Sequence, residues 1–443
     1  MKSIVISSNS SGGGKTTVTL GIMKALINRG YGVQGYKVGP DYIDPGFHKN
    51  ITSKDSRNLD LFLMGEDGVK AAYSRGEGDY GVVEGVMGLY DGIGITSEYS
   101  TASVAKLLNL PIILVITPKA QSVTLCAEIN GLVGFEDANT VGIILNNINE
   151  SYYKLLKSAI EKNCSEKLKV LGYLPQNENI ELKSRHLGLV QSSEVEELDK
   201  KIQLCSELIE RHVDIDLMLK CFKETEKFKD NYHVKNIGLR TAIAYDKAFS
   251  FYYKENIELL EELGHVEYFS PLKDVELPKN IDFLYLGGGY PEVFIDELSS
   301  NKEMLNSINT ALGNGLTAYA ECGGLMYLCQ HIEGKNSVGF FKGDAYMSQE
   351  LKNFGYAKIK VDNENSMLKR DLHINCHEFH KSYVELREKT IYTLEKDMYD
   401  GTKKKWKCGY VKNNTLAAYA HTHFFGNMDF LKQIINKINR RCD

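Results

Sequence analysis

The stretch KSIVISSNSSGGGKTT (residues 2–17) decides the fold of the first half of the chain. The β-branched run Lys2–Ser7 is typical of a buried strand, and a helical pattern follows over Thr16–Asn28. A glycine-rich loop that ends in Lys15 and Thr16 lies between them. This order of strand, loop and helix is the one that a phosphate-binding loop requires.

Each residue type in this loop has a part in binding phosphate. Glycines let backbone amides turn toward the phosphate oxygens, and the helix N-terminus adds partial positive charge. The lysine neutralises the terminal phosphates, and the threonine hydroxyl can bind magnesium. Asn9 stands where the strict GxxxxGK[ST] pattern has glycine. A glycine turn without a ligand is the less favoured alternative. We predict that the nucleotide contacts are Gly12, Gly13, Gly14, Lys15, Thr16 and Thr17.

Length and composition exclude several classes of protein. The chain has 443 residues, enough for two or three domains, of which we favour two. It has no apolar run of the roughly 18 residues that span a bilayer, so we expect no membrane segment. The net charge of −5 lacks the footprint of a nucleic-acid-binding protein. The nine cysteines show no CxxC pair, and residues 1–7 do not resemble a secretory signal. We therefore expect free thiols and a cytoplasmic location.

Short apolar runs alternate with helical patterns in both halves of the chain, which predicts parallel sheets with helices on both faces. The predicted strands of the first half, after the opening one, are 81–84, 111–117 and 141–146, with a helix over 101–108. Those of the second half are 240–245, 281–286, 316–320 and 416–420. A lysine-rich, weakly periodic stretch around 217–234 separates the halves. We expect a P-loop domain over 1–220, a linker over 221–236 and a second α/β domain over 237–443.

Three acidic residues of the first half are candidates for the nucleotide site. Asp41 and Asp44 lie in KVGPDYIDPG (residues 37–46), where they can order magnesium and substrate or form ordinary turns, so both alternatives stay open. Glu84 ends a predicted buried strand. From that position an acid can face a magnesium-bound nucleotide.

The segment AECGGL (residues 320–325) predicts a nucleophile at a tight turn between a strand and a helix. A helix N-terminus lowers the pKa of a thiol, so Cys322 is the cysteine that we expect to be reactive. His421, in YAHTHF at the end of another predicted strand, is the candidate base. The loop Gly287–Gly289 offers backbone amides for an oxyanion hole.

The cluster CHEFH (residues 376–380) raises the alternative of a zinc site. It lacks the i, i+4 histidine spacing of HExxH, and no second ligand pair has the spacing of a structural zinc site. A structural histidine pair or a loop that contacts substrate is therefore favoured for His377 and His380.

Taken together, these motifs resemble those of the cobyrinic acid a,c-diamide synthases, which are glutamine-dependent amidotransferases of cobalamin biosynthesis. The matching segments run in order over nearly the whole chain: SSGGGKTT, KVGPDYIDPGFH, RNLDLF, VVEGVMGLYDG, RHLGL, DKAFSFYY, FSPLKD, YLGGGYPEVF, AYAECGGLMYL, CHEFHKS and YAHTHF.

The resemblance implies an enzyme in two parts. The N-terminal half resembles dethiobiotin synthetase, which uses Mg-ATP to phosphorylate a carboxylate, and the C-terminal half resembles a class I glutaminase. The expected reaction converts the c and a acetate groups of cobyrinic acid to amides through acyl phosphates, with ammonia from glutamine. The implied assignments are Cys322 and His421 as catalytic residues, Thr16, Glu84 and Asp44 as magnesium ligands, and Asp41, Tyr42, Asp44, Gly288 and Gly289 as substrate contacts.

Three departures and two alternatives accompany this interpretation. The family loop begins with glycine where this chain has Ser8, an acid is expected near Thr117, and His423 occupies the place of the usual third triad residue, a glutamate. The alternative substrate is nickel-sirohydrochlorin, which the ATP and glutamine motifs do not distinguish from cobyrinic acid. A partition or regulatory P-loop ATPase is a remote alternative, since it leaves residues 240–424 unexplained. A homodimer is possible.

Overall fold

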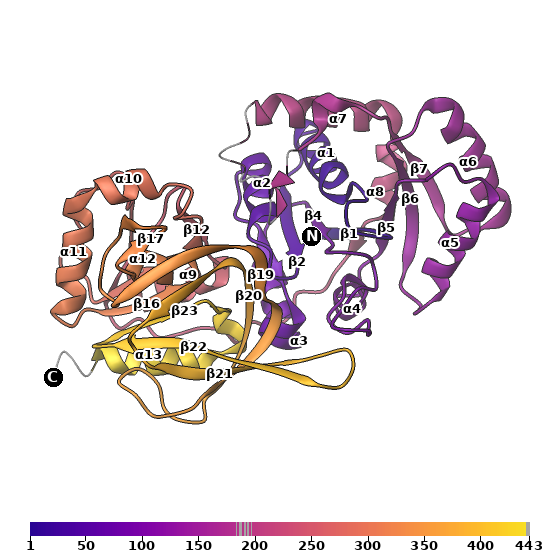
Figure 1. The fold of residues 1–443 in the computed structure, drawn as a ribbon. Coiled ribbons are helices and arrows are strands. Elements are labelled where there is room, and N and C mark those ends of the chain that lie inside the picture. The colour runs from indigo at the N-terminus through magenta and orange to yellow at the C-terminus, as the bar shows by residue number, and fades with distance from the viewer. Residues whose placement is uncertain (183, 186–187, 190–191, 193–194, 196, 440–443) are drawn as a thin grey trace. The chain divides into compact units, whose positions relative to one another are not determined.

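The computed structural model describes residues 1–182, 184–185, 188–189, 192, 195 and 197–439. Within them the chain forms two compact units (Figure 1). The first comprises Met1–Leu61 and Gly65–Asn231, and the second Phe62–Met64 and Tyr232–Asp443. Of the segment RHLGL, which supports the family resemblance, His186 and Leu187 lie outside the described residues.

The first unit is built on a parallel sheet in the order β3-β2-β4-β1-β5-β6-β7. Its strands are β1 (Lys2–Ser8), β2 (Val33–Val38), β3 (Arg57–Leu59), β4 (Tyr80–Glu84), β5 (Ile112–Ile116), β6 (Thr140–Asn146) and β7 (Lys169–Leu174). β1 pairs with β4 on one side and with β5 on the other, so it is an inner strand of the sheet. The loop that follows β1 therefore begins between the carboxyl ends of two neighbouring strands. The strand β10 (Lys223–Glu224) pairs antiparallel with β1, and β8 (Ser184–Arg185) pairs with β9 (Gly188–Leu189).

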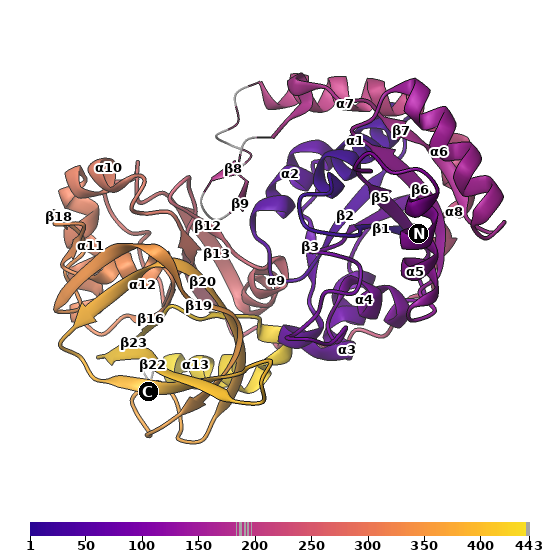
Figure 2. The ribbon, with the colours of Figure 1, turned by 45° about the vertical axis from the view of Figure 1, so that its right-hand side comes forward.

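Helices cover this sheet, as α/β architecture requires. They are α1 (Lys15–Asn28), α2 (Ile43–Thr52), α3 (Leu61–Ser74, broken at Gly65), α4 (Thr101–Leu107), α5 (Val123–Gly134), α6 (Glu150–Asn163), the 3₁₀ turn η1 (Glu178–Ile180), α7 (Leu198–His212) and α8 (Ile215–Cys221). α7 lies along α1 in both views (Figures 1 and 2). Ile22 of α1 and Ile209 of α7 belong to one buried apolar cluster.

The predicted strands and helices of this half are confirmed to within one or two residues at each end. The strands β2, β3 and β7 were missed, because they are short or lack polar alternation. In the lysine-rich stretch, Ile215–Cys221 is helical and Lys223–Glu224 forms β10, where no strand was expected.

The second unit contains one mixed sheet in the order β13-β11-β14-β16-β23-β22-β21-β19-β17-β18, with β20 paired to β19 and β24. Its parallel part consists of β11 (Leu239–Ala244), β13 (Gly264–Phe269), β14 (Phe283–Leu286), β16 (Thr317–Glu321) and β23 (Thr415–Ala418). The remaining strands are β17 (His331–Ile332), β18 (Lys335–Asn336), β19 (Gly343–Val361), β20 (His373–Leu386), β21 (Thr390–Asp397), β22 (Lys403–Lys412) and β24 (His421–Thr422).

Helices and a small separate strand pair complete this unit. The pair is β12 (Phe249–Phe251) with β15 (Gly288–Gly289). The helices are α9 (Lys254–Leu263), α10 (Ile295–Ser300), α11 (Lys302–Gly313), α12 (Gly323–Leu328), the 3₁₀ turn η3 (Phe424–Gly426) and α13 (Met428–Asn439). The two long strands β19 and β20 run side by side (Figure 2).

The four parallel strands predicted in the second half are confirmed, as is the α/β class of both parts. The antiparallel strands β19 to β22 were not predicted. β19 and β20 pair with interruptions at Met347, Lys352 and Gly355, and such irregularities blur a two-residue period. Of the residues described, none belongs to a helix that is both long and apolar enough to cross a bilayer.

Candidate functional site

The glycine loop joins β1 to α1 as predicted, and its geometry explains two of its glycines. Gly14 has φ 83°, a left-handed conformation that precedes the helix. A Cβ atom at Gly14 would lie 2.1 Å from Asn146 Nδ2, and one at Gly13 would lie 2.2 Å from Ser8 Oγ. Gly12 has φ 73° and open space around it. The loop is therefore closed tightly at its base and open at Gly12.

Lys15 is the first residue of α1 and is folded back onto the loop. Its Nζ atom donates to Ser10 O (3.0 Å) and to Met87 O (2.5 Å). Burial, together with the nearby charge of Lys37, lowers the pKa of Lys15 to about 8. Thr17, also in α1, accepts a hydrogen bond from Cys205 of α7 through its carbonyl oxygen (3.3 Å). Thr17 thus connects the start of α1 to its covering helix.

Glu84 is the centre of a buried polar network at the carboxyl end of β4. Its Oε1 atom accepts from Thr16 Oγ1 (2.6 Å) and Lys37 Nζ (3.0 Å), and its Oε2 atom contacts His48 Nε2 (2.8 Å). Burial opposes ionisation of Glu84, but the charge of Lys37 and the hydrogen bonds from His48 and Thr16 outweigh it and lower its pKa. Glu84 is therefore a fixed anion directly beside the phosphate loop.

Lys37, at the end of β2, links Glu84 to the predicted substrate loop. Its Nζ atom lies 2.5 Å from Asp44 Oδ2, and burial of Lys37 is outweighed by Asp44 and Glu84, which raise its pKa. Burial raises the pKa of Asp44 well above its usual value, and the charges of Asp41 and Glu84 add to this. One ammonium group thus holds two carboxylates together.

Asp41 and Tyr42 lie at the start of α2 rather than in a free loop. Asp41 Oδ1 accepts from the backbone amides of Ile43 (2.7 Å) and Asp44 (3.2 Å), so it caps this helix. The turn alternative therefore describes Asp41 in this structure, while Asp44 reaches the polar network. The hydroxyl group of Tyr42 is buried.

The sequence analysis missed Lys37 and His48, which complete this network. His48 is fully buried, and its Nδ1 atom contacts Ser56 Oγ (2.9 Å) while Nε2 contacts Glu84. The signal for His48 was its position four residues after Asp44, which places both on one face of α2. The signal for Lys37 was a lysine within an otherwise uncharged strand, VQGYKV.

The donor atoms of this network suit a magnesium nucleotide. Mg²⁺ prefers oxygen ligands and usually takes one or two carboxylates together with waters and phosphate oxygens. Thr16 Oγ1, Glu84 and Asp44 offer such oxygens within one network around Lys37. The described part of the chain contains no group of three or more His, Cys, Asp or Glu residues arranged to hold a metal ion by themselves. The arrangement fits an ion that arrives with phosphate oxygens.

Uncharged side chains occupy the position where an acid was expected. Thr117, which follows β5, donates from Oγ1 to Gly13 O (3.2 Å). Asn146, at the end of β6, donates to Thr117 Oγ1 (3.0 Å). At the other side of the loop, Asn9 Nδ2 donates to Glu128 Oε1 (2.6 Å). A carboxylate is therefore present near the loop, but on α5.

Cys322 lies at the elbow predicted between β16 and α12. Its backbone has φ 47° and ψ −103°, a conformation that non-glycine residues rarely adopt and that often marks a functional position. A Cβ atom at Gly324 would lie 2.3 Å from Leu286 O, and one at Gly323 would lie 3.1 Å from Gly289 N. The elbow is thus pressed against the segment 286–289.

The same segment contacts the imidazole of His421. A Cβ atom at Gly288 would lie 2.5 Å from His421 Cε1 and 3.3 Å from His421 Nε2. The backbone of Gly288 and Gly289 therefore lies against both the elbow and the Nε2 edge of the ring. The amide of Gly287 donates to Tyr252 Oη (2.8 Å). Gly288 and Gly289 form β15, which pairs with β12.

The expected pKa of Cys322 is wrong in direction. We expected a helix N-terminus to lower it, but burial raises the pKa of this thiol, and the charges of Glu292 and Glu378 add to the increase. α12 has only six residues, so its dipole is weak against full burial. The surroundings of the thiol therefore oppose its ionisation.

The residues of CHEFH belong to β20, a strand rather than a helix or loop. His380 Nδ1 donates to Ser382 O (2.8 Å), and its ring stacks on Tyr419 with centroids 3.9 Å apart. Cys376 Sγ donates to Ala357 O (3.3 Å). His377 lies opposite His421 in the sheet, with ring centroids 5.9 Å apart. No zinc-type cluster forms among these described side chains.

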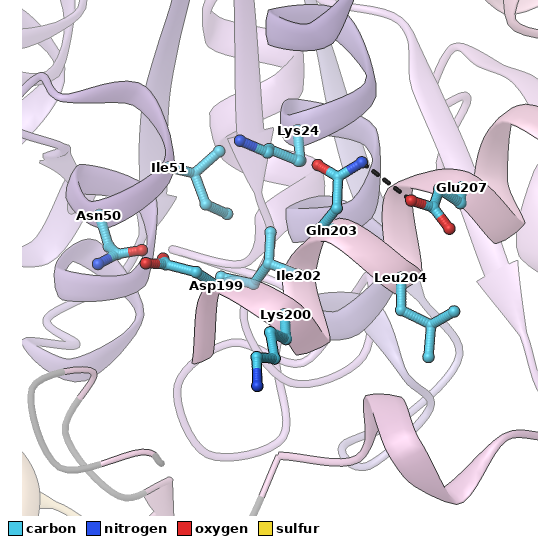
Figure 3. Close-up of a pocket in the computed structure, with 9 residues that line it drawn as sticks. All are labelled: Lys24, Asn50, Ile51, Asp199, Lys200, Ile202, Gln203, Leu204 and Glu207. Atoms are coloured by element: carbon cyan, nitrogen blue, oxygen red, sulfur yellow. Dashed lines mark hydrogen bonds between the residues drawn. The ribbon is translucent and has the colours of Figure 1, made fainter. Parts of the chain in front are cut away.

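A hollow of about 620 Å³ lies between α1, α2 and α7 (Figure 3). Its lining includes Lys24, Asn50, Asp199, Gln203 and Glu207, with Gln203 donating to Glu207 (3.1 Å). None of the predicted site residues lines it.

Comparisons with known proteins match each half of the chain to a different domain family. Residues 4–190 match the family of CobQ/CobB/MinD/ParA nucleotide binding domains, and residues 240–428 match CobB/CobQ-like glutamine amidotransferase domains. A cobyrinate a,c-diamide synthase of Clostridium acetobutylicum is 64% identical over 98% of this chain and 100% of that protein. One of Clostridium tetani is 63% identical over 99% and 100%, and one of Listeria innocua is 42% identical over 98% and 99%. The chain therefore belongs to the cobyrinate a,c-diamide synthase family, enzymes with a nucleotide binding domain and a glutamine amidotransferase domain.

Proposed function

We propose that this enzyme amidates the c and a carboxylates of cobyrinic acid, using ATP and ammonia released from glutamine. One observation carries the proposal: full-length relatives above 60% identity are named for this reaction, and both groups of residues that it needs are present in the chain. The residue roles below and the limits 1–220, 221–236 and 237–443 belong to the proposal. A cytoplasmic location and a homodimer stay predictions.

In the first unit, the chain's own groups would make a carboxylate reactive toward ammonia. A carboxylate resists attack until one of its oxygens becomes a leaving group, which phosphorylation by ATP provides. The amides of Gly12 to Gly14 and the cation of Lys15 would bind the phosphates, with Thr17 beside them. Magnesium, held by Thr16, Glu84 and Asp44, would neutralise phosphate charge during the transfer.

Lys37 extends this set, since its pKa is raised and the group stays charged in the buried network. It would keep Asp44 and Glu84 at a fixed spacing around the phosphate loop. We assign Asp41 and Tyr42 to substrate binding at the start of α2, with Asp41 retaining its capping contacts. The charged groups of Lys37, Asp44 and Glu84 would therefore already be positioned before ATP binds.

In the second unit, Cys322 Sγ would attack the side-chain amide of glutamine. His421 would accept the thiol proton and return it to the leaving ammonia, after which water hydrolyses the thioester to glutamate. The amides of Gly288 and Gly289 would stabilise the oxyanion, consistent with their position against both the elbow and the imidazole. Because burial raises the pKa of the thiol, we expect its activation to follow glutamine binding.

A comparison of two nitrogen sources tests the proposal. Cys322→Ser should abolish amidation of cobyrinic acid with glutamine while amidation with ammonium salts continues. Products are followed by mass spectrometry, which resolves two successive conversions of acid to amide. Cys329→Ser is the matched control. Cys329 is also a buried cysteine, but it lies just after α12, at the end away from Cys322, and its thiol donates to Leu325 O (3.3 Å). Loss of both activities in Cys322→Ser, with an intact fold, would refute the division of labour.

A further inference from the structure

We propose that Glu321 is the third group of the glutaminase site, a positioning residue that orients His421 and stabilises it when it carries the thiol proton. This inference rests on the proposed roles of Cys322 and His421. It concerns a residue next to the nucleophile in sequence, not the position two residues after the histidine, which His423 occupies.

Glu321 is held rigidly at the end of β16. It is 1% exposed, and the three donors to its carboxylate are buried. Its Oε2 atom accepts from Tyr285 Oη (2.8 Å), and its Oε1 atom accepts from Tyr319 Oη (2.8 Å) and from the amide of Thr422 (2.9 Å). These three donors leave the carboxylate little freedom to move. The bond to Thr422 also ties Glu321 to the strand that carries His421.

The imidazole of His421 lies between this carboxylate and the backbone of Gly288. Its Nδ1 atom is 3.8 Å from Glu321 Oε2, while its Nε2 edge lies against Gly288. The two nitrogens therefore face different partners, as in sites where a base is oriented by a carboxylate. A distance of 3.8 Å is too long for a hydrogen bond, so in this state the contact is electrostatic. Such contacts often tighten when substrate binds.

The other nearby acids have partners of their own. Glu255 Oε2 lies 3.4 Å from His423 Nε2, and His423 Nδ1 accepts from the amide of Phe425 (3.2 Å). Glu378 accepts from Trp406 Nε1 (3.3 Å) and lies 3.4 Å from His380. His423 thus forms a second buried pair instead of completing the first one. Of these three acids, Glu321 is the one that contacts His421.

The proton balance assigns each atom one task. The Sγ–H bond of Cys322 breaks as an Nε2–H bond forms on His421, and Sγ bonds to the amide carbon of glutamine. Nδ1 keeps its own proton, and Glu321 stays ionised throughout. The proton on Nε2 then leaves with ammonia as the C–N bond breaks. Glu321 contributes charge and orientation, and no proton passes through it.

Several titratable groups surround this pair and bear on its pH behaviour. The groups that interact with His421 or Glu321 are Cys322, Tyr285, Tyr319, His377, Cys376, Tyr392 and Tyr252. Among them, the charge of Glu321 by itself raises the pKa of Cys322. A purely local effect of removing Glu321 would therefore make the thiol easier to ionise. A role through His421 predicts the opposite, a less reactive thiol.

This difference in sign supplies the test. In the full-length enzyme, Glu321→Gln should reduce kcat for glutamine hydrolysis by about 10²-fold or more with KM changed little, since loss of an orienting carboxylate has effects of this size or larger. Alkylation of Cys322 by iodoacetamide at pH 7 should slow at least about tenfold. Amidation with ammonium salts should continue. Glu255→Gln, the matched change in the other buried pair, should leave glutaminase activity within about threefold.

The opposite results are equally clear. An unchanged or faster alkylation, or equal losses in Glu321→Gln and Glu255→Gln, would overturn the role of Glu321. If Glu321→Gln does not fold, Glu321→Asp is the second variant, because it keeps the carboxylate but shortens the side chain by one methylene. A wild-type kcat in Glu321→Asp would also overturn the role of Glu321. Failure of the proposed function is separate, because it would appear as glutamine-driven amidation by Cys322→Ser.

Discussion

The phosphate loop site and the cysteine elbow treat buried charge in opposite ways. Around the loop, Glu84 is ionised because Lys37, His48 and Thr16 contact it, and the cations are present before any ligand. At the elbow, burial and the charges of Glu292, Glu378 and Glu321 raise the pKa of the Cys322 thiol. The first site therefore has charges that suit a polyanion, while the surroundings of the second oppose ionisation of its proposed nucleophile. The following predictions test this contrast.

The largest effect is expected at Lys15. Lys15→Ala removes the cation of the loop, so amidation should fall by at least about 10³-fold with either glutamine or ammonium as nitrogen source. Hydrolysis of glutamine and alkylation of Cys322 should remain measurable. Lys24→Ala is the control, because Lys24 is on the same helix but lines the hollow of Figure 3. Retained ammonium-driven activity in Lys15→Ala would contradict the assignment of this loop.

The buried network of Glu84 should be more sensitive than an exposed ion pair. Glu84→Gln leaves Lys37 buried beside a neutral amide, and breaking such a pair costs about 3–5 kcal/mol. The free energy of unfolding, from denaturant titration, measures this loss. The control is Glu210→Gln, which breaks a pair with Arg29 whose side chains are 30% and 34% exposed, and which should cost about 0–1 kcal/mol. Equal losses would show that the network of Glu84 is not specially dependent on charge pairing.

The elbow should be sensitive to backbone shape where the loop site is sensitive to charge. Gly324→Ala would place a Cβ atom 2.3 Å from the backbone oxygen of Leu286, so the elbow must move. A displacement of this kind reduces catalysis by about 10²-fold, here of glutamine hydrolysis alone. Gly313→Ala, which meets open space in α11, should be silent. Full glutaminase activity in Gly324→Ala would show that the elbow is not held against Leu286.

The smallest effect is a shift in the pH at which Lys15 loses its proton. Heteronuclear NMR of the lysine side chains should resolve one with a midpoint near pH 8 that Lys15→Met removes. Because this folded-state pKa lies below the usual value of 10.5, the folded chain releases the proton first. The stability contributed by Lys15 therefore rises with pH between about 8 and 10.5. A midpoint near 10.5 would show that burial does not govern Lys15.

The contrast also explains what could be predicted from the sequence. The loop from β1 to α1 depends on residues within one short stretch, so Lys15 and Thr16 could be predicted as site residues from their pattern. Lys37 depends on Asp44 and on Glu84, which is 47 positions away, and its strand is buried on both faces without alternation. The role of Lys37 could therefore not be predicted from the residues next to it in the sequence.

In the second unit, the residues near His421 are determined by the pairing of strands and not by their distance from it along the chain. The third glutaminase residue was sought after His421, because the family pattern places it there. Glu321 approaches His421 through a carboxylate that also accepts the amide of Thr422, a contact between residues 101 positions apart. Such proximity follows from sheet pairing, which the sequence analysis did not derive beyond the parallel strands. The antiparallel strand β20, which pairs with β24, was likewise not predicted.

The pairing of β10 with β1 bears on how the protein can be divided. Lys2 and Ser3 of β1 face Glu224 and Lys223, and Tyr73 donates to Ser3 while contacting Thr225. A fragment that stops at residue 220 would lose β10 and leave Lys2 and Ser3 paired with β4 alone. A fragment extended past Asp230, which also pairs with Arg75, would keep it. Where an expression fragment ends therefore decides whether the amino end of the strand that leads into the phosphate loop has a neighbour on both sides.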